Sequence, residues 1–300
     1  MLIDSQSRKI KEENITLRNV SCGYPPRFSN VLTNLSIGFD TGCITAIVGC
    51  NGSGKSTLMR CLSGLLKLNH GAVDIFGANP QVNFREWNQT CAYVSQQPTF
   101  DREMTGLEIL DYFSCMYGQA KEKRRQRISS LIDLMNLNDI KSRKISSYSG
   151  GNLQKVHLAI GLINDPELLL FDEPTNNLDA MAKHRFWSYL KSLSSDERKT
   201  SIVISHDLEF IEQYADVLVV MDRGAIRYQG SVRNFIDDST VHEQSGSNLV
   251  ADKAHMPRTS LFDALSRAIH FDMNKTAHSH YGERGSRRGQ RNQNRRRGER

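Results

Sequence analysis

The residues with the most recognisable chemistry form one glycine-rich stretch, GCNGSGKST, between Gly49 and Thr57. It follows an apolar run over 43–48 and precedes a helix-forming segment over 58–66, so a strand, a loop and a helix are expected in that order. Glycines allow successive backbone N–H groups to point inward, and the start of the following helix adds positive potential at the same point. The stretch therefore predicts a phosphate-binding loop for a nucleoside triphosphate.

Individual roles follow from this type of loop. Lys55 is expected to reach the β- and γ-phosphates, and the hydroxyl of Ser56 to ligate Mg²⁺. The residues expected to bind the nucleotide here are Gly49, Asn51, Gly52, Gly54, Lys55, Ser56 and Thr57.

Short strand-like runs separated by turn residues surround the start of this loop. They cover 15–20, 31–39 and 43–48, with turn clusters at 24–26 and 40–42. We expect a small antiparallel layer that leads into the strand ahead of the phosphate loop.

The segment 98–162 changes to helical spacing. Two apolar helix faces are expected, formed by Leu107, Leu110, Phe113 and Met116, and by Ile128, Leu131, Ile132 and Met135. Beyond this block, strand candidates at 168–171, 201–205 and 217–221 flank a helix predicted over 180–193. Alternating strands and helices indicate an α/β fold with a parallel sheet.

The overall charge belongs to one end of the chain. The 300 residues carry a formal net charge of +6, and the segment 281–300 alone contains eight Arg and two Glu. The remainder holds 31 residues of each sign and is neutral, so the basicity of the tail indicates nothing about the nucleotide site. The tail is of low complexity and is expected to be disordered.

Composition also excludes several classes of protein. The six cysteines show neither a CxxC pair nor a zinc-ligand spacing, which is typical of free thiols in a reducing compartment. The polar start of the chain does not resemble a signal peptide, and no run of 18 apolar residues is present. We therefore expect no membrane-spanning segment.

Further motifs narrow the class of nucleotide-binding protein. SGGNLQK begins at Ser149, 94 residues after Lys55; LLLFDE places Asp172 another 23 residues on, and ISHD places His206 34 residues later. With these motifs in this order, the region from about 14 to 236 resembles the ATP-binding cassette (ABC) family of transport ATPases. The resemblance implies a P-loop NTPase core with a parallel sheet, an antiparallel β subdomain and a helical subdomain over about 97–163.

Catalytic roles are implied by the resemblance. Asp172 lies on the metal side and Glu173 acts as general base toward the attacking water, because an apolar strand ending in two acids brings both to the γ-phosphate. His206 contacts the γ-phosphate, and Gln96 in YVSQQP reaches the metal; Gln97 is the alternative register. Ser56, Gln96 and Asp172 are thus the expected Mg²⁺ ligands.

The resemblance also implies residues that bind the adenine base and residues that contact a second subunit. Tyr24 is expected to stack on adenine, with core packing as the alternative. Ser149, Gly150 and Gly151 belong to the signature motif, which binds the ATP of the opposite subunit, and Asp179 to the loop beside that site. A homodimer or heterodimer of cassettes is implied.

The signature departs from the family pattern twice. Tyr148 replaces an apolar residue, and Asn152 replaces a glutamine. Asparagine keeps the amide, so we expect function to be retained. A weakened signature, as in asymmetric heterodimers, is the alternative.

The implied function is that of an ATP-hydrolysing subunit of an ABC transporter, peripheral on the cytoplasmic face of the membrane. Separate integral membrane permease subunits would contact 98–118, and the stretch 104–118 resembles exporters of the drug and polysaccharide type more than importers. An importer subunit is one alternative. A soluble ABC ATPase acting on RNA or ribosomes is the other, since the Arg-rich tail suits RNA or anionic lipid.

The chain divides accordingly. A polar extension over 1–13 precedes the ATP-binding domain over 14–236. A linker over 237–280 follows, with an amphipathic helix expected at 260–273, and the tail ends the chain. That helix either packs on the domain or a partner or is disordered.

Overall fold

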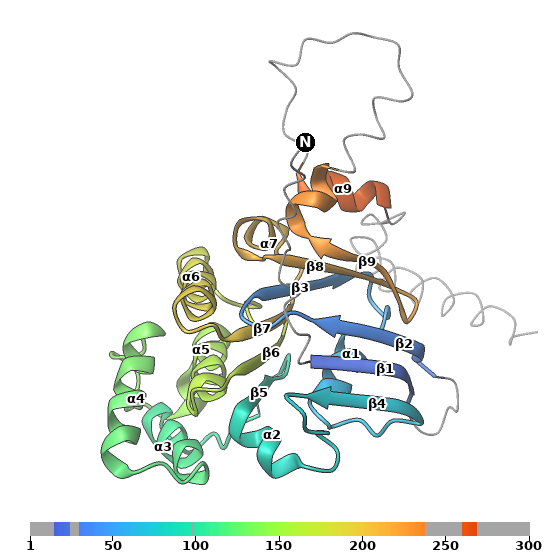
Figure 1. Ribbon diagram of the computed structural model, residues 1–300. Coiled ribbons are helices and arrows are strands. Elements are labelled where there is room, and N and C mark those ends of the chain that lie inside the picture. Colours follow the sequence, from blue (N-terminus) through green and yellow to red (C-terminus); the bar gives the residue numbers. More distant parts are fainter. Residues whose placement is uncertain (1–14, 25–29, 98, 238–259, 269–300) are drawn as a thin grey trace, which may run out of the picture. The chain divides into compact units, whose positions relative to one another are not determined.

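The computed structural model describes residues 15–24, 30–97, 99–237 and 260–268 (Figure 1). The chain forms two units, Met1–Asp238 and Ser239–Arg300. All described strands belong to the first unit.

A six-stranded sheet forms the centre of the first unit. Its order is β5-β6-β7-β3-β8-β9; the first five strands are parallel and β9 runs antiparallel to β8. Their bounds are Cys91–Val94 (β5), Leu168–Asp172 (β6), Thr200–Ile204 (β7), Ile44–Gly49 (β3), Val217–Asp222 (β8) and Ala225–Ser231 (β9). Strands β3, β6 and β7 are buried along their whole length, as expected of parallel strands covered on both faces.

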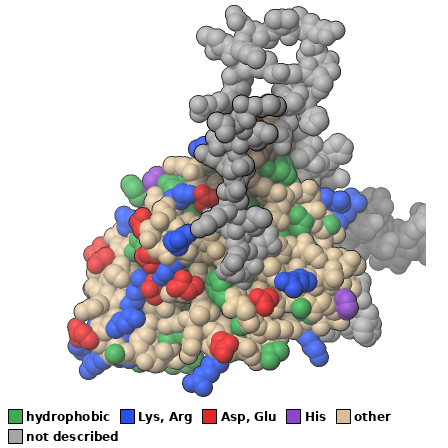
Figure 2. Space-filling model, in the orientation of Figure 1, with side chains coloured by type: hydrophobic (Ala, Val, Ile, Leu, Met, Phe, Trp, Pro, Cys, Tyr) green, Lys and Arg blue, Asp and Glu red, His purple; other side chains and the backbone are tan. Residues whose placement is uncertain are grey.

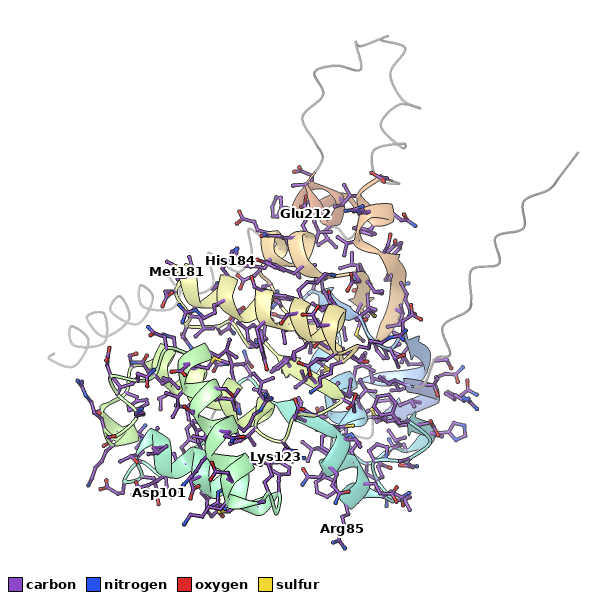
Figure 3. All side chains as sticks on the ribbon, turned by 60° about the vertical axis from the view of Figure 1, so that its left-hand side comes forward. Arg85, Asp101, Lys123, Met181, His184 and Glu212 are labelled. Atoms are coloured by element: carbon purple, nitrogen blue, oxygen red, sulfur yellow. The ribbon has the colours of Figure 1, made fainter. Side chains whose placement is uncertain are left out.

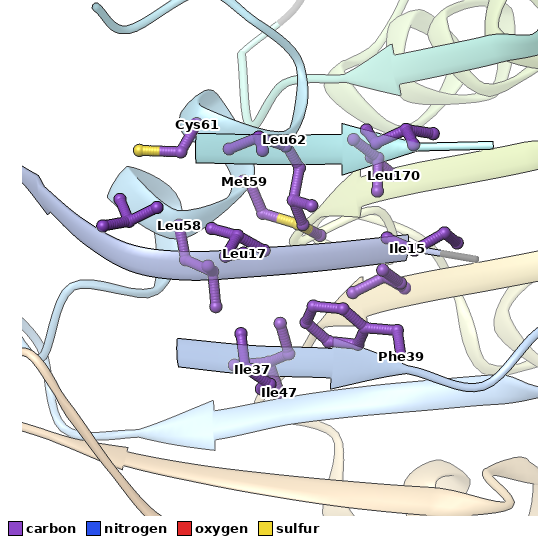
Figure 4. Close-up of a cluster of buried hydrophobic side chains, with 14 of the residues drawn as sticks. Ile15, Leu17, Ile37, Phe39, Ile47, Leu58, Met59, Cys61, Leu62 and Leu170 are labelled. Atoms are coloured by element: carbon purple, nitrogen blue, oxygen red, sulfur yellow. The ribbon is translucent and has the colours of Figure 1, made fainter. Parts of the chain in front are cut away.

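A three-stranded antiparallel sheet lies beside it. Its order is β2-β1-β4, and the bounds are Ile15–Cys22 (β1), Leu32–Phe39 (β2) and His70–Ile75 (β4). Helix α1, Lys55–Leu62, contributes Leu58, Met59 and Leu62 to a core shared with both sheets. Figure 4 shows these side chains meeting Leu17 and Phe39 of the small sheet. The expected antiparallel layer and parallel sheet are both confirmed, and they share one core.

The remaining helices flank these sheets. Their bounds are Phe84–Thr90 (α2), Gly106–Met116 (α3), Lys121–Leu134 (α4), Gly150–Leu162 (α5), Ala180–Asp196 (α6) and Leu208–Tyr214 (α7). Helices α3, α4 and α5 lie between β5 and β6 in the sequence. They pack against one another and form the helical block of Figure 1. Thr105 begins α3: its Oγ1 accepts from the N–H of Glu108 at 3.2 Å, and the carboxylate of Glu108 accepts from the N–H of Thr105 at 2.7 Å.

The first of the two predicted apolar helix faces is wrong. Leu107 and Met116 are 39% and 67% exposed, whereas Ile109 and Leu110 are buried. Leu107, Leu110, Phe113 and Met116 are spaced by three residues, and in a helix of 3.6 residues per turn each such step rotates about 60° backward, so that the first and last lie on opposite sides. The second predicted face, Ile128, Leu131, Ile132 and Met135, is buried as expected.

The surface of the first unit carries both signs of charge. Basic and acidic side chains are interspersed on the face shown in Figure 2. Arg85 on α2 extends away from the ribbon in Figure 3. This mixture agrees with the neutral balance expected outside the tail.

The second unit is described only for helix α9, Leu261–Ala268, within the range where an amphipathic helix is expected. The Oγ of Ser260 accepts from the N–H of Asp263 at 3.2 Å, which caps the helix. The extension 1–13, residues 269–273 and the Arg-rich tail lie outside the described residues. None of the helices in the described parts of the chain is long and apolar enough to cross a lipid bilayer.

Acid should destabilise the fold through His157 of α5. Burial lowers the pKa of this imidazole to about 4. The ring packs edge-on against Phe100, with 5.8 Å between the ring centroids. The unfolded chain titrates near 6.5, so it binds the proton first as the pH falls from 6.5 to 4, at a cost approaching ~3 kcal/mol of folding free energy. His157→Leu should therefore lose less stability than the wild type between pH 7 and pH 5, as measured by urea unfolding. An equal loss in both proteins would contradict this role.

Candidate active site

Most of the predicted site residues meet in one cavity of about 350 Å³. It opens where the strands of the parallel sheet end, the usual ligand position in such folds. Its predicted members are Tyr24, Asn51, Gly52, Gly54, Lys55, Ser56, Thr57, Gln96, Asp172, Glu173 and His206. A larger cavity of about 880 Å³ lies between α3 and α4, and the predicted site residues do not line it.

The phosphate loop contains three glycines with positive φ, Gly49, Gly52 and Gly54, and two of them also have close neighbours. Gly49 ends β3 at φ 153°, where a Cβ would overlap the carbonyl oxygen of Met221. Gly54 has φ 102° and begins α1, where a Cβ would lie 2.8 Å from the side chain of Leu32. At Gly49 a side chain is opposed by both backbone conformation and a fixed backbone neighbour, whereas at Gly54 the positive φ is the main obstacle, because the leucine methyl can shift.

The side chain of Lys55 reaches back across the phosphate loop to its first residues. Its Nζ donates to the carbonyl oxygens of Gly49 at 2.7 Å and Cys50 at 3.1 Å. Burial lowers the pKa of Lys55, while the nearby charges of Glu173 and Asp172 oppose that shift. The ammonium group therefore lies at the loop in the electrostatic field of both acids.

The acidic pair stands at the end of β6. Burial raises the pKa of Asp172, and a hydrogen bond from Ser56 opposes this. A hydroxyl and a carboxylate oxygen held this close are the hard donors that Mg²⁺ prefers, so these residues fit the ion. Glu173 is buried with a φ of 54°, and its N–H donates to the carbonyl of Ile204 at 3.0 Å. Such a left-handed conformation in a non-glycine residue is often found at functional sites.

His206 faces the second acid. Its Nε2 lies 2.8 Å from Oε1 of Glu173, and its side chain is half exposed to the cavity. A histidine in this place can hold a carboxylate in one orientation. The structure thus brings together the residue assigned to the attacking water and the residue assigned to the γ-phosphate.

Gln96 and Gln97 point to different spaces. Gln96, just beyond β5, lines the cavity with Asp172 and Ser56, whereas Gln97 lines a separate groove beside Phe84 and Trp87. The geometry therefore agrees with the register that assigns Gln96 to the site.

Tyr24 lies at the side of the same cavity. Its ring is partly exposed, and its hydroxyl is 3.4 Å from Oγ1 of Thr57. A partly exposed ring beside the phosphate loop suits stacking on a base better than core packing.

The signature residues do not line this cavity. Ser149 and Gly150 are exposed, and Oγ of Ser149 caps α5 by accepting from the N–H of Asn152 at 3.3 Å. A Cβ on Gly151 would lie 2.6 Å from the carbonyl oxygen of Asn177, so the loop after β6 packs directly on the start of α5. A helix start with free N–H groups can bind an anion, but the anion must come from elsewhere.

Asp179 and Tyr148 have structural contacts of their own. Asp179 begins α6 by accepting from the N–H of Ala182 at 2.8 Å, and this hydrogen bond lowers its pKa. The hydroxyl of Tyr148 donates to the carbonyl of Ile140 at 2.6 Å and lies over Gly106, where there is no side chain. The departure at Tyr148 is therefore accommodated without displacing the helix start.

Comparison with known proteins identifies the family. The ABC transporter family model matches residues 32–176. The Nod factor export ATP-binding protein I of Sinorhizobium fredii is 32% identical over 85% of this chain and 72% of its own length. The chain belongs to the ABC transporter family of ATP-binding proteins. The ABC transporter ATP-binding protein NatA of Bacillus subtilis is 30% identical over 68% of this chain and 83% of that protein. ABC transporter A family member 1 of Dictyostelium discoideum is 32% identical over 69% of this chain, which spans only 23% of that protein.

Solved structures agree with this assignment. A structure of the ATP-binding subunit of an ABC transporter has the same fold, with a TM-score of 0.72 at 24% identity over 85% of this chain and 98% of that one. The dimeric ABC cassette MJ0796, in a post-hydrolysis state with ADP and Pi, gives a TM-score of 0.67 at 25% identity, covering 72% of this chain and 98% of that one. This chain is therefore an ABC ATPase with a P-loop NTPase fold.

Two positioning contacts of this ABC ATPase were missed at the sequence level. Asp207, next to His206, accepts from Oγ1 of Thr175 at 2.6 Å and from Nζ of Lys183 at 3.0 Å. Gln154 of α5 donates to the carbonyl of Pro174 at 2.9 Å. Both bind the loop after β6 to a neighbouring segment; adjacency to the catalytic motifs was the only available signal.

Lys55→Ala should weaken ATP binding itself. It removes the cation of the phosphate loop, and we expect the dissociation constant to rise by roughly tenfold or more. Titration with a fluorescent ATP analogue measures it, and Lys67→Ala, which removes an exposed charge beyond α1, is the control. Unchanged binding in Lys55→Ala would overturn the assignment of this loop.

Proposed function

We propose that the chain is the ATP-hydrolysing subunit of an ABC exporter and acts as a dimer of cassettes on separate membrane subunits. The observation that carries the dimer is the exposed start of α5, where Ser149 and Gly150 do not line the chain's own cavity. A head-to-tail second cassette would bring this helix start to the γ-phosphate. A relative of the same fold has a structure described as dimeric, which supports the arrangement.

We assign hydrolysis to the residues at the ends of β6 and β7. Glu173 would take the proton of the attacking water, and His206, 2.8 Å away, would hold its carboxylate in place and contact the γ-phosphate. Ser56, Asp172 and Gln96 would hold Mg²⁺, which neutralises phosphate charge when bound. The same reasoning assigns adenine to Tyr24 and the γ-phosphate of the partner cassette to Ser149, Gly150 and Gly151, beside Asp179.

Membrane subunits would dock at an aromatic groove of about 380 Å³. The groove lies between α2 and the helical block, and Phe84 and Leu65 at its edge are exposed. It includes Gln97 and Phe100, so a helix seated there would touch the segment that carries Gln96. Phe113 of α3 lines it too, within the stretch 98–118 expected to make this contact.

Export is favoured over import by the Sinorhizobium relative, whose name describes an export protein. The importer remains the alternative. The competing function, an ABC ATPase acting on RNA or ribosomes, is favoured by the eight arginines of 281–300, which would also suit anionic lipid. We place the chain at the cytoplasmic face of the membrane, held there by its permease subunits.

Co-purification separates these functions. Full-length protein used as bait in detergent-solubilised membranes should recover a polytopic membrane protein that stimulates ATP hydrolysis. Phe84→Arg should abolish that recovery because it places a charge in the aromatic groove, while basal ATPase activity stays unchanged. Val82→Arg, at an exposed apolar residue that does not line the groove, is the matched control. Recovery of RNA or ribosomal proteins without a membrane partner would favour the competing function.

Glu173→Gln should separate ATP binding from hydrolysis. The amide keeps the shape of the side chain but loses the base, so turnover should fall by roughly 100-fold or more. ATP should still produce a dimer on size-exclusion chromatography, because the contacts to phosphate and to the second cassette are untouched. Hydrolysis near the wild-type rate would show that another group acts as base.

A further inference from the structure

The hydroxyl of Tyr24 is held by helix α1. Nη1 of Arg60 donates to it at 2.9 Å, and Oγ1 of Thr57 lies 3.4 Å away. The guanidinium carbon of Arg60 is 5.6 Å from the centroid of the tyrosine ring. Tyr24 is followed by residues 25–29, which the structure does not describe. The described contacts of this hydroxyl therefore all come from one helix.

That helix also carries the phosphate-binding side chains. Lys55, Ser56 and Thr57 occupy its first turn, and Arg60 follows one turn later on the same side as Ser56 and Thr57. Arg60 does not line the cavity. It therefore does not contact a ligand in the cavity directly, although its charge lies close enough to Asp172 to oppose the rise in the pKa of that carboxyl.

Arg60 has a second aromatic neighbour. It interacts with the hydroxyl of Tyr93 on β5, the strand that leads to Gln96. Burial raises the pKa of Tyr93 to about 12, so this phenol stays neutral beside the guanidinium. Arg60 thus connects the tyrosine at the cavity wall to the central sheet.

We propose that Arg60 is a positioning residue for the nucleotide base: it fixes the ring of Tyr24 in the orientation in which the base stacks. This rests on the proposed role of Tyr24 in nucleotide binding. A tyrosine held before the ligand arrives loses less rotational freedom on binding, so the base is bound more tightly. Because α1 holds both Tyr24 and the phosphate loop, the base and phosphate subsites keep a fixed separation.

A purely structural role for Arg60 makes a different prediction. A cation in the last turn also stabilises a helix through the helix dipole. Loss of that stabilisation would loosen α1 as a whole and weaken every ligand of the phosphate loop. Positioning of Tyr24 affects only ligands that possess a base.

The experiment compares ATP with inorganic tripolyphosphate, which lacks the base. Both are titrated calorimetrically in EDTA into the full chain and into Arg60→Met, Arg60→Lys and Tyr24→Phe. Arg60→Met should weaken the binding of ATP by roughly three- to tenfold, because a charged donor to an exposed hydroxyl is lost. The binding of tripolyphosphate should be unchanged. Arg60→Lys should retain part of the affinity for ATP, and the control Lys67→Met, which removes an exposed charge beyond α1, should keep the wild-type affinity.

The double variant gives the decisive comparison. Tyr24→Phe removes the accepting hydroxyl but keeps the ring, so it should weaken ATP as Arg60→Met does. The double variant, which combines Arg60→Met with Tyr24→Phe, should bind ATP no more weakly than either single variant, because each change removes the same contact. Additive effects, equal weakening of tripolyphosphate, or unchanged ATP binding in Arg60→Met would each overturn the proposal. Failure of the wild-type protein to bind ATP would instead overturn the proposed function.

Discussion

The active cavity depends on the register of three parallel strands. Ile204 of β7 is paired with Asp172 of β6 on one side and with Ile47 of β3 on the other. The three strands therefore end at nearly the same level, and the next residues of each are the phosphate loop, Glu173 and His206. The phosphate loop lies more than 100 residues before Glu173, and His206 lies 33 residues after it, so only the sheet can place all three close together.

That placement buries charges at close quarters. Lys55, Asp172 and Glu173 are only 8%, 4% and 5% exposed, and buried charges are costly unless they are paired or hydrogen-bonded. The pKa of Lys55 is lowered and that of Asp172 raised, both chiefly by burial, and in each case the opposite charge of the other residue resists the shift. The charges of the site thus compensate one another, and Glu173 has a left-handed backbone conformation in which its N–H donates to the carbonyl of Ile204. Such preorganisation is what transition-state stabilisation in phosphoryl transfer requires.

The sequence indicated those parts of the fold in which the chemistry is local. Buried strands such as Leu168–Asp172 are uninterrupted apolar runs, and the phosphate loop has its glycines where positive φ is needed. Strand β4, in contrast, was not predicted, because only Val73 and Ile75 of its six residues are buried and no apolar run forms. The face of α3 was misjudged because spacing by three residues does not follow one side of a helix.

Contacts between distant segments were also beyond sequence reasoning. Arg60 and Tyr24 are 36 residues apart, and Asp207 and Thr175 are 32 apart. Neither pair has a spacing that any regular element would bring together. The fit of Tyr148 likewise depends on the absence of a side chain at Gly106, which lies in α3. Such complementarity is fixed by packing and carries no local pattern.

The same packing connects the residues to which we assign hydrolysis with the helical block. The loop that follows Glu173 is bound to α5 by the hydrogen bond from Gln154 to Pro174 and by the close approach of Asn177 to Gly151. It is bound to the segment after His206 through Thr175 and Asp207. A change at the γ-phosphate that moved Glu173 and His206 would therefore be felt at the start of α5, because tightly packed contacts transmit displacement instead of absorbing it. Since α5 also packs on α3, which lines the aromatic groove, the contacts form one continuous path from the phosphate to the surface where we place the membrane partner.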